Sequence, residues 1–387
     1  MRIGRERHRK AVEGLLRSRP VVALLGARQV GKTTLGRAIA ADRGKRATFF
    51  DLEDDRDVAR LAEPTLALEP LRGLVVLDEI QRRPELYPAL RVLADRPRTP
   101  ARFLLLGSAS PDLLKQSAET LAGRIAFHEL GGFDLSEVGS GALDRLWFRG
   151  GFPDAYLPRT HKDSHKWRVD FIRTFVERDI PNLGIQIPAT TLARFWTMLA
   201  HYHGQLWNGS ELAGALGVSH PTVRSYLDLL VKTFVVEELR PWTENVGKRV
   251  VKSPRIYVAD SGLLHAMLQL PTPSDLLGHP KAGASWEGFI IGQLRRQLGV
   301  EPDECYFWRT HAGAELDLLV VRGKRRLGFE IKRTDRPRVT KSMMSALDSL
   351  ALSELTIIHA GKETFPLTNK IRALAACNMT AAIRPLR

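Results

Sequence analysis

Short apolar runs along the first 130 residues predict the buried strands of a parallel sheet. Val21–Leu25, Gly73–Leu77 and Phe103–Leu106 are such runs, and Ile125–Leu130 reads as a further strand. Strands buried on both faces have this character, because helices cover both sides of a parallel sheet. Helical composition from Thr34 to Ala40 follows the first run. This part of the chain is therefore expected to have an α/β fold.

The pattern between residues 210 and 257 predicts two helices followed by strands. Apolar residues recur at helical spacing from Ser210 to Val218, with Ser210 as the expected N-cap, and a second helix begins at Pro221 after a turn. The segments Phe234–Pro241 and Gly247–Tyr257 alternate like the strands of a wing. Together they favour a helix-turn-helix module of the winged-helix kind.

A further α/β domain is predicted at the C-terminus. The proline-rich stretch Pro271–Pro280 indicates a linker or an irregular loop before it. An amphipathic helix is expected from Trp286 to Arg296, and strands over Cys305–Arg309, Ala314–Val321 and Leu327–Lys332. The last two strands are joined by a short turn, as in a hairpin.

Length and composition favour a modular globular protein in a reducing compartment. With 387 residues the chain exceeds one ordinary core. Its two cysteines, Cys305 and Cys377, form no CxxC motif or Cys/His cluster, so neither a disulfide framework nor a zinc site is expected. No run approaches the roughly 20 apolar residues of a membrane span, and the basic start does not resemble a signal peptide. We expect a cytoplasmic protein with no membrane partner.

The formal net charge of +15 favours a polyanionic partner such as nucleic acid. A proteome that is rich in arginine throughout is the alternative explanation.

A phosphate-binding loop follows the first predicted strand. Residues 26–33 satisfy the pattern GxxxxGK[ST] and lie between a strand and a helix, which is the order that the motif requires. Its glycines let backbone N–H groups surround phosphates. Lys32 is expected to meet the β and γ oxygens of ATP, and Thr33 the Mg²⁺ ion. The predicted nucleotide-binding residues are Gly26, Ala27, Arg28, Gln29, Val30, Gly31, Lys32, Thr33 and Thr34.

Acidic and polar residues at the ends of later strands complete the predicted ATPase site. Asp78 ends an apolar strand and is expected in the Mg²⁺ shell, and Glu79 is expected to activate water as a general base. Ser108 is a candidate to lie between this acidic pair and the γ-phosphate. Arg124 precedes the next strand, at the place where AAA-type ATPases, which these motifs resemble, present an arginine to a neighbouring subunit's nucleotide; a plain surface arginine is the alternative.

The segments GARQVGKTTL, LVVLDEIQ, LLLGSAS and SAETLAGR resemble, in this order, the bacterial and archaeal AAA-type ATPases with a poorly characterised C-terminal extension. The resemblance implies an ATPase core over residues 1–130 and a helical lid over 131–200, which contains Arg149–Pro153. A winged helix over 201–270 and the C-terminal domain over 271–387 would follow. It also implies ATP and Mg²⁺ as cofactors. An arginine that acts on a neighbour's nucleotide implies a homo-oligomer, with a hexameric ring as the expected form.

The winged-helix module supplies candidate contacts to DNA. Arg224 lies early in the predicted recognition helix. Lys248, Arg249, Lys252 and Arg255 follow in the basic wing segment, where they could meet phosphates. Winged helices also serve as packing modules, so contact with DNA is one of two interpretations.

Acids and a lysine on the C-terminal strands resemble the PD-(D/E)xK nuclease superfamily. Glu330 and Lys332 are two residues apart on one strand, so their side chains leave the same face. Asp317 lies on the adjacent hairpin strand, and Glu287 on the preceding helix. The resemblance implies a restriction-endonuclease-like α/β domain in which the acids bind Mg²⁺ and Lys332 positions the nucleophile. The alternatives are a solvated hairpin and a nuclease-like fold used only for binding.

The sequence thus predicts an ATP-hydrolysing motor or remodeller that acts on branched or processed DNA in repair, recombination or defence, with a candidate metal-dependent nuclease domain. The competing hypothesis is an ATP-dependent regulatory switch that binds a protein partner.

Overall fold

The computed structural model describes residues 3–97, 101–108, 120–243 and 253–386, which form two compact units. Unit 1 contains residues 1–132 with two short later segments, 180–185 and 232–235. Unit 2 contains the other residues from 133 to 387. Among the described residues, no helix is both long and apolar enough to cross a bilayer.

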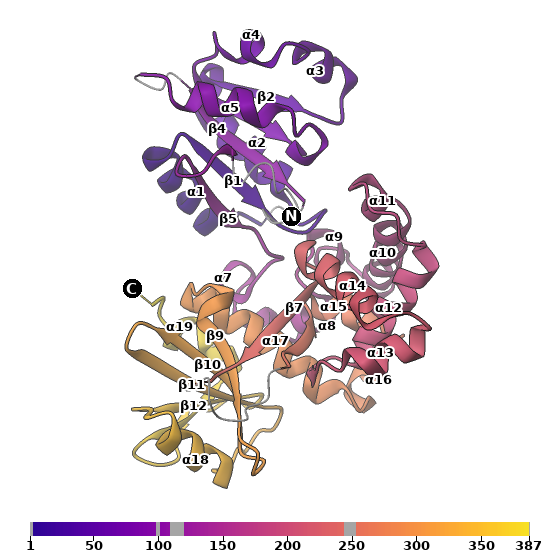
Figure 1. Cartoon of the computed structure of the whole chain (residues 1–387). Helices are drawn as coiled ribbons and strands as arrows, with labels where there is room; N and C mark the ends of the chain where they lie inside the picture. Colours follow the sequence, from indigo (N-terminus) through magenta and orange to yellow (C-terminus); the bar gives the residue numbers. More distant parts are fainter. Residues whose placement is uncertain (1–2, 98–100, 109–119, 244–252, 387) are drawn as a thin grey trace. The chain divides into compact units, whose positions relative to one another are not determined.

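A five-stranded sheet forms the centre of unit 1 (Figure 1). Its strands are β1 (Val21–Leu25), β2 (Ala47–Asp51), β3 (Gly73–Asp78), β4 (Ala101–Gly107) and β5 (Ile125–Glu129). The strand order is β2-β3-β4-β1-β5, and every pair is parallel. The carboxyl ends of β1, β3 and β4 therefore meet at one edge of the sheet. That edge is where polar loops can collect around a ligand.

Helices cover this sheet and bury its apolar side chains. They are α1 (Glu6–Ser18), α2 (Lys32–Arg43), α3 (Asp55–Arg60), α4 (Pro64–Leu68) and α5 (Leu86–Ala94), with 3₁₀ turns at Gly44–Arg46 and Ile80–Arg82. The later segment 180–185 of this unit contains the short α11 (Ile180–Asn182). Phe50, Val75, Leu90 and Phe103 share one buried cluster between strands and helices. The α/β fold predicted for this region is confirmed.

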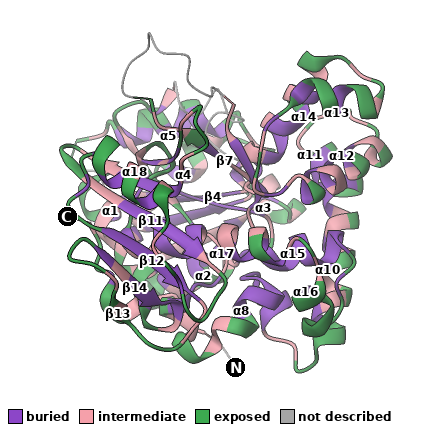
Figure 2. Ribbon diagram, turned by 90° about the horizontal axis from the view of Figure 1, so that it is seen from below, coloured by how far each residue is buried: buried purple, intermediate pink, exposed green. Residues whose placement is uncertain are grey.

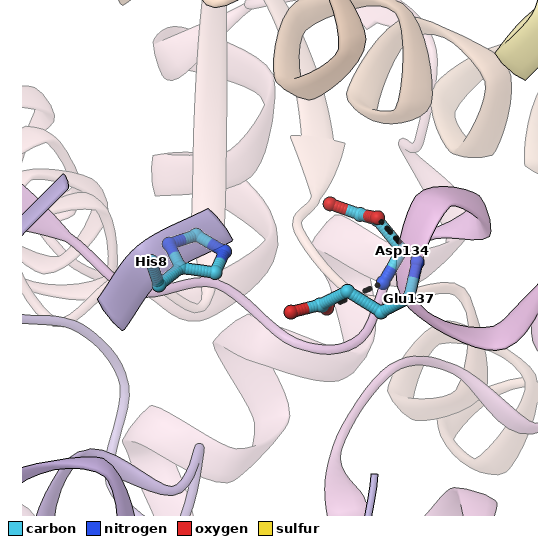
Figure 3. Close-up of side chains that lie close together, drawn as sticks. All are labelled: His8, Asp134 and Glu137. Carbon is cyan, nitrogen blue, oxygen red and sulfur yellow. Dashed lines mark hydrogen bonds between the residues drawn. The ribbon is translucent and has the colours of Figure 1, made fainter. Parts of the chain in front are cut away.

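Unit 2 begins with helices. They are α7 (Leu135–Val138), α8 (Leu143–Arg149), α9 (Pro153–Tyr156), α10 (His161–Thr174), a π-helical turn (Phe175–Asp179) and a 3₁₀ turn (Ser140–Ala142). Asp134 and Glu137 cap the start of α7 reciprocally, and Figure 3 draws the two hydrogen bonds as dashed lines; it also draws His8, which belongs to α1 of unit 1. Such a capping box pairs two backbone N–H groups that the helix leaves free.

A buried polar network ties these helices to α15 (Ser261–Met267), whose residues are all buried (Figure 2). Arg168 of α10 donates to the carbonyl oxygens of Phe148, at 3.2 Å, and Gly262, at 2.9 Å. His265 lies with Nδ1 2.9 Å from the Phe148 oxygen and Nε2 2.7 Å from Ser285 Oγ. These hydrogen bonds offset part of the cost of burying the two side chains, although Nη2 of Arg168 has no partner among the described residues.

The next elements have the order expected of a winged helix. They are α12 (Ala189–His201), β6 (Gln205–Leu206), α13 (Gly209–Leu216), α14 (His220–Lys232), β7 (Val236–Pro241) and β8 (Arg255–Val258). β8 pairs antiparallel with both β6 and β7. Ser210 was expected to cap α13, but Asn208 does so, because its side chain accepts from the N–H of Glu211 at 3.3 Å.

The C-terminal residues add helices and strands to the same unit. They are α16 (Pro273–Gly278), α17 (Ala282–Leu298), β9 (Cys305–Arg309), β10 (Glu315–Arg322), β11 (Arg325–Lys332), α18 (Lys341–Ser349), β12 (Leu355–His359), β13 (Phe365–Pro366), β14 (Ile371–Ala375) and α19 (Met379–Ala382), with 3₁₀ turns at Pro302–Glu304 and Ala376–Asn378. The linker expected at 271–280 was wrong in part: Thr272 caps α16 with its side chain, and Pro273 suits the first helical turn.

One mixed sheet runs through both predicted C-terminal modules. Its described strands have the order β13-β14-β12-β11-β10-β9-β7-β8-β6. β7 pairs with β9, which aligns Arg240 with Tyr306, so the sheet crosses the boundary predicted at residue 270. The domain boundaries stay a prediction, but residues on both sides of 270 pack in one unit.

Candidate functional site

The loop from Gly26 to Gly31 joins β1 to α2 and has a backbone that favours glycine at both ends. Gly26 has φ 153°, and a Cβ there would lie 2.2 Å from the carbonyl oxygen of Leu130. Gly31 has φ 101° and directly precedes α2, which starts at Lys32. The N-terminal N–H groups of a helix lack intrahelical partners and carry partial positive charge. The loop is therefore suited to an anion such as a nucleotide phosphate.

The ammonium group of Lys32 is held inside this loop. The side chain is buried, and Nζ donates to the carbonyl oxygens of Gly26 and Ala27, both at 2.9 Å. Burial lowers the pKa of Lys32 to about 8, against the opposing effect of the Glu79 and Asp78 charges. Lys32 thus lies at the place that the sequence pattern predicts.

Thr33 and Asp78 form a hydrogen-bonded pair at the ends of α2 and β3. Asp78 is buried, and burial raises its pKa to about 6 against the hydrogen bond from the Thr33 side chain. A hydroxyl and a carboxylate are oxygen ligands of the kind that Mg²⁺ accepts. The pair therefore fits the metal-binding role predicted for both residues, which stays a prediction.

Glu79 follows β3 in a left-handed backbone conformation and is held by two polar neighbours. Its φ is 55°, which is uncommon for a residue other than glycine. Ser108 Oγ donates to the Glu79 carboxylate at 3.2 Å, and the Gln81 side-chain amide donates to it as well. Gln81 also accepts from the N–H of Ser108, at 3.4 Å. The predicted base and the predicted polar residue thus meet directly, and Gln81, which sequence reasoning missed, contacts both.

The remaining predicted nucleotide-binding residues lie around the same loop. Arg28 forms an ion pair with Glu53 at 3.5 Å, and Val30 is buried. Thr34 is exposed, and Gln29 has a positive φ of 62°. The signal that could have identified Gln81 is its place two residues after the acidic pair, on the 3₁₀ turn that starts at Ile80.

Arg124 is paired within its own chain. Nη2 lies 2.8 Å from Asp95 Oδ2, and Nε contacts the other carboxylate oxygen. The guanidinium is partly exposed, with 31% of its side-chain surface accessible. A role on a neighbour's nucleotide would require this ion pair to open.

The predicted DNA contacts of the winged-helix module have mixed outcomes. Lys248, Arg249 and Lys252 lie outside the described residues. Arg224 donates to both carboxylate oxygens of Glu238, at 2.7 and 3.1 Å, so internal acids already compensate its charge. Arg255 was expected to meet phosphates, and that was wrong: its side chain is 8% exposed and points into a cluster of acids.

That cluster contains the four residues that resemble a nuclease site. Glu287 comes from α17, Asp317 from β10, and Glu330 and Lys332 from β11. Lys332 Nζ lies 2.7 Å from Glu330 Oε1, as their shared strand face predicts. The N–H of Ile331 donates to Asp317 Oδ2 at 2.8 Å. The hairpin thus places its two acids and its lysine together.

Burial and mutual repulsion make the acids of this cluster hard to ionise. Burial and the Asp317 charge raise the pKa of Glu287 to about 7 and that of Glu330 to about 7. The buried Oε2 of Glu330 has no hydrogen-bond partner among the described residues. An orphaned carboxylate oxygen between neighbouring acids is what a bound divalent cation would satisfy, so Asp317 and Glu330 fit such a metal.

Two further residues of the cluster come from β8. Arg255 Nη1 lies 3.2 Å from Glu287 Oε1, and Nη2 lies 2.8 Å from Glu315 Oε2. Tyr257 donates its hydroxyl hydrogen to Glu287 Oε1 at 2.6 Å. Arg255 and Tyr257 are two residues apart on one strand, so the sequence places their side chains on the same face. The neighbouring sequence did not indicate which acids that face would contact.

Comparisons with known proteins match three stretches of the chain to domain families. Residues 18–139 match the AAA domain family. Residues 140–274 and 282–379 match two domains of unknown function, DUF8612 and DUF4143. The uncharacterized proteins Rv2008c of Mycobacterium tuberculosis and Mb2031c of Mycobacterium bovis are each 52% identical over 359 residues, which is 92% of this chain and 80% of theirs.

Solved structures with a related fold are more distant. The Walker-type ATPase PABY2304 of Pyrococcus abyssi has a TM-score of 0.48 at 16% identity, over 69% of this chain and 96% of that one. The RuvB Holliday junction branch migration motor of Thermotoga maritima has a TM-score of 0.29 at 19% identity, over 61% of this chain and 89% of that one. At these TM-scores neither structure carries a functional argument.

Proposed function

Since this chain belongs to the same family as the uncharacterized protein Rv2008c and its N-terminal unit is an AAA-type ATPase domain, we propose that it uses Mg²⁺ and ATP to move or remodel DNA. The observation that carries the ATPase part is the meeting of Lys32, the Thr33–Asp78 pair and Glu79 at the carboxyl edge of one parallel sheet. A cation that faces the phosphates, ligands for a metal ion and a general base are the groups that phosphoryl transfer to water requires.

Each of these residues has a distinct part in the proposed reaction. Lys32 exchanges its two backbone carbonyl partners for oxygens of the β and γ phosphates. Thr33 and Asp78 would hold a Mg²⁺ ion, which would stabilise the negative charge of the phosphates. Glu79 removes a proton from the attacking water, while Ser108 and Gln81 fix the direction of its carboxylate. Catalysis then comes from positioning and from stabilisation of developing charge.

The proposal of DNA as partner rests on charge and on the order of elements. The net charge is +15, and the elements from α12 to β8 have the order of a winged helix. A cavity of about 940 Å³ also lies between the start of β11 and the C-terminal segment. Five cations line this cavity: Lys324, Arg325, Arg326, Arg372 and Arg384. The one acid among its described lining residues, Glu354, is already paired with Arg372 at 2.6 Å, so the lining suits a phosphate backbone.

We expect duplex or branched DNA to stimulate ATP turnover, and the exposed cations of this cavity to carry part of the binding. Combined Lys324→Ala, Arg325→Ala and Arg384→Ala substitutions should reduce the slope of log affinity against log salt by about 2 to 3, because each phosphate contact contributes about 0.9. Fluorescence anisotropy with labelled duplex, at roughly 50 to 200 mM salt, measures that slope.

A control variant with the same change of charge separates a local site from a general electrostatic effect. Alanine at Lys45, Lys341 and Lys362, three exposed lysines that do not line the cavity, should leave the slope nearly unchanged. Equal slopes for the two triple variants would contradict the site. ATP turnover that is indifferent to single-stranded, duplex, forked and four-way DNA would instead favour the switch that binds a protein partner.

We also propose that Arg124 acts on the nucleotide of a neighbouring copy in a closed homo-oligomer, with a hexamer as the expected ring. Arg124→Ala should lower turnover by about 10³-fold and leave ATP affinity nearly unchanged. Asp95→Asn, which removes only the partner of Arg124, should keep most of the turnover. Mixing Arg124→Ala with Lys32→Ala chains should restore activity at interfaces that combine an intact loop with an intact arginine.

Two results would contradict this proposal. Light scattering could find a monomer with full activity in the presence of ATP and DNA. Alternatively, Arg124→Ala and Asp95→Asn could lower the melting temperature equally and turnover in proportion, which would give the ion pair a structural role alone.

A metal-dependent nuclease activity of the C-terminal domain is the second candidate function. The orphaned Glu330 oxygen beside Asp317 is the observation that favours it. A divalent cation held there would polarise a phosphodiester and lower the pKa of a bound water. Lys332, at 2.7 Å from Glu330, is placed to orient the nucleophile.

A further inference from the structure

The acidic cluster of unit 2 already contains a cation from a distant part of the sequence. Arg255 extends from β8 over the ring of Phe307, with its guanidinium carbon 5.0 Å from the ring centroid. Its Nη1 lies 3.2 Å from Glu287 Oε1 and 3.7 Å from Asp317 Oδ1. The guanidinium thus lies between two of the acids that resemble metal ligands.

The carboxylates of the cluster differ in the hydrogen-bond and ion-pair partners of their oxygens. Glu287 Oε1 accepts from both Arg255 and the Tyr257 hydroxyl. Glu330 has one oxygen on Lys332 and one buried oxygen without a partner among the described residues. Asp317 lies between the two halves, since one oxygen faces Arg255 and the other accepts from the N–H of Ile331. Among the described residues, Glu330 Oε2 is the buried carboxylate oxygen of this cluster that has no hydrogen-bond partner.

A guanidinium stays charged at all pH values that proteins tolerate, and it cannot give up its position by losing a proton. Two cations within about 4 Å repel strongly in a medium of low dielectric constant. A divalent ion that bound Glu287 Oε1 would therefore have to displace Arg255 from a position where it contacts three acids.

We propose that Arg255 is a permanent cation of this site. It keeps Glu287 as its own ion-pair partner, so that a divalent metal binds at Asp317 and Glu330. The inference rests on the metal-binding part of the proposed function. It assigns to Arg255 the charge compensation that a second metal supplies in two-metal sites. Glu287 and Tyr257 are then positioning residues for Arg255.

Binding of Mn²⁺ to the full chain without nucleotide tests this division of the acids. Asp317→Asn should weaken Mn²⁺ binding by about 10- to 100-fold, the range typical of lost support at a metal site. Glu287→Gln should change it by less than about threefold, well below that range. Isothermal titration calorimetry and the Mn²⁺ electron paramagnetic resonance signal give affinity and stoichiometry independently of any cleavage. The double variant Asp317→Asn and Glu330→Gln gives the background of the rest of the chain.

Removing the guanidinium of Arg255 should allow Glu287 to contribute to Mn²⁺ binding. In an Arg255→Gln background, Glu287→Gln should now weaken Mn²⁺ binding by about tenfold, or a second ion should bind. Arg309→Gln, which removes an exposed arginine of β9, is the matched control and should leave the Glu287 effect small. Circular dichroism checks that each variant is folded, and if Arg255→Gln is not, the two single acid variants decide the matter.

The outcomes separate this inference from the proposed function. Binding that falls equally in Glu287→Gln and Asp317→Asn would overturn the inference alone. Wild-type binding no stronger than that of the double acid variant would overturn both the inference and the proposed metal site, and would leave a nuclease-like fold used for binding.

Discussion

Lys32→Ala is expected to lower ATP turnover by on the order of 10²- to 10³-fold, the cost of removing one preorganised group that stabilises developing charge. ATP affinity should fall by about 10- to 100-fold as well, since a hydrogen bond to a charged group contributes about 1.5–3 kcal/mol. The reason is the position of Nζ, which donates to two loop carbonyl oxygens at 2.9 Å. Phosphate oxygens would replace these carbonyl oxygens as its acceptors.

Glu79→Gln should have a different defect at the same edge of the sheet. The variant keeps the shape of the side chain that Ser108 and Gln81 contact, but it cannot accept a proton from water. Turnover should fall by about 10²- to 10⁴-fold with ATP binding retained, because a general base contributes about that much. We therefore expect Lys32→Ala to lose affinity for ATP, and Glu79→Gln to bind ATP without hydrolysing it.

Calorimetry with ATP and an assay of phosphate release distinguish the two defects. Lys45→Ala, which changes an exposed lysine just beyond α2, is the control for the loss of one positive charge. Normal affinity and normal turnover in both Lys32→Ala and Glu79→Gln would remove the loop from the proposed mechanism.

The nucleotide site could be predicted from the sequence because each of its parts is local. The loop from Gly26 to Thr33 depends on glycines at fixed offsets, and the strand that ends at Asp78 is a continuous apolar run. In a parallel sheet, carboxyl ends of neighbouring strands necessarily meet at one edge. Only Gln81 escaped, since a glutamine after an acidic pair has no pattern of its own.

The acidic cluster could be predicted only in part, because pairing across the chain decides its charge. Glu330 and Lys332 share a strand face by their spacing, and their contact follows. Arg255 seemed to continue the basic segment before it, yet β8 turns it toward Glu287, which lies 32 residues later. Likewise Arg224 meets Glu238 of β7, a partner that helical spacing cannot indicate.

A glycine pair in the helical part of unit 2 had no physical explanation in the sequence. Gly150 ends α8 with φ 79° and ψ −179°, a backbone region that is essentially restricted to glycine. The next residue, Gly151, donates its N–H to Asp260 Oδ2 at 2.7 Å, and Asp260 Oδ1 caps α15 by accepting from Leu263 at 2.9 Å. The carboxylate of Asp260 thus joins α8 to α15.

We expect Gly150→Ala to destabilise unit 2 by about 2–6 kcal/mol, since backbone strain of about 1–3 kcal/mol adds to an overpacking cost of similar size. A Cβ at this position would lie 2.0 Å from Asp260 Oδ1, so the carboxylate would have to leave both of its backbone partners. Gly139→Ala is the matched control: Gly139 has φ 86° and ψ 151°, but a Cβ there meets no atom within 4 Å. That variant should lose only the strain, about 1–3 kcal/mol. Urea unfolding followed by circular dichroism measures both, and equal midpoints for the two variants would show that the close approach of Asp260 to Gly150 contributes nothing.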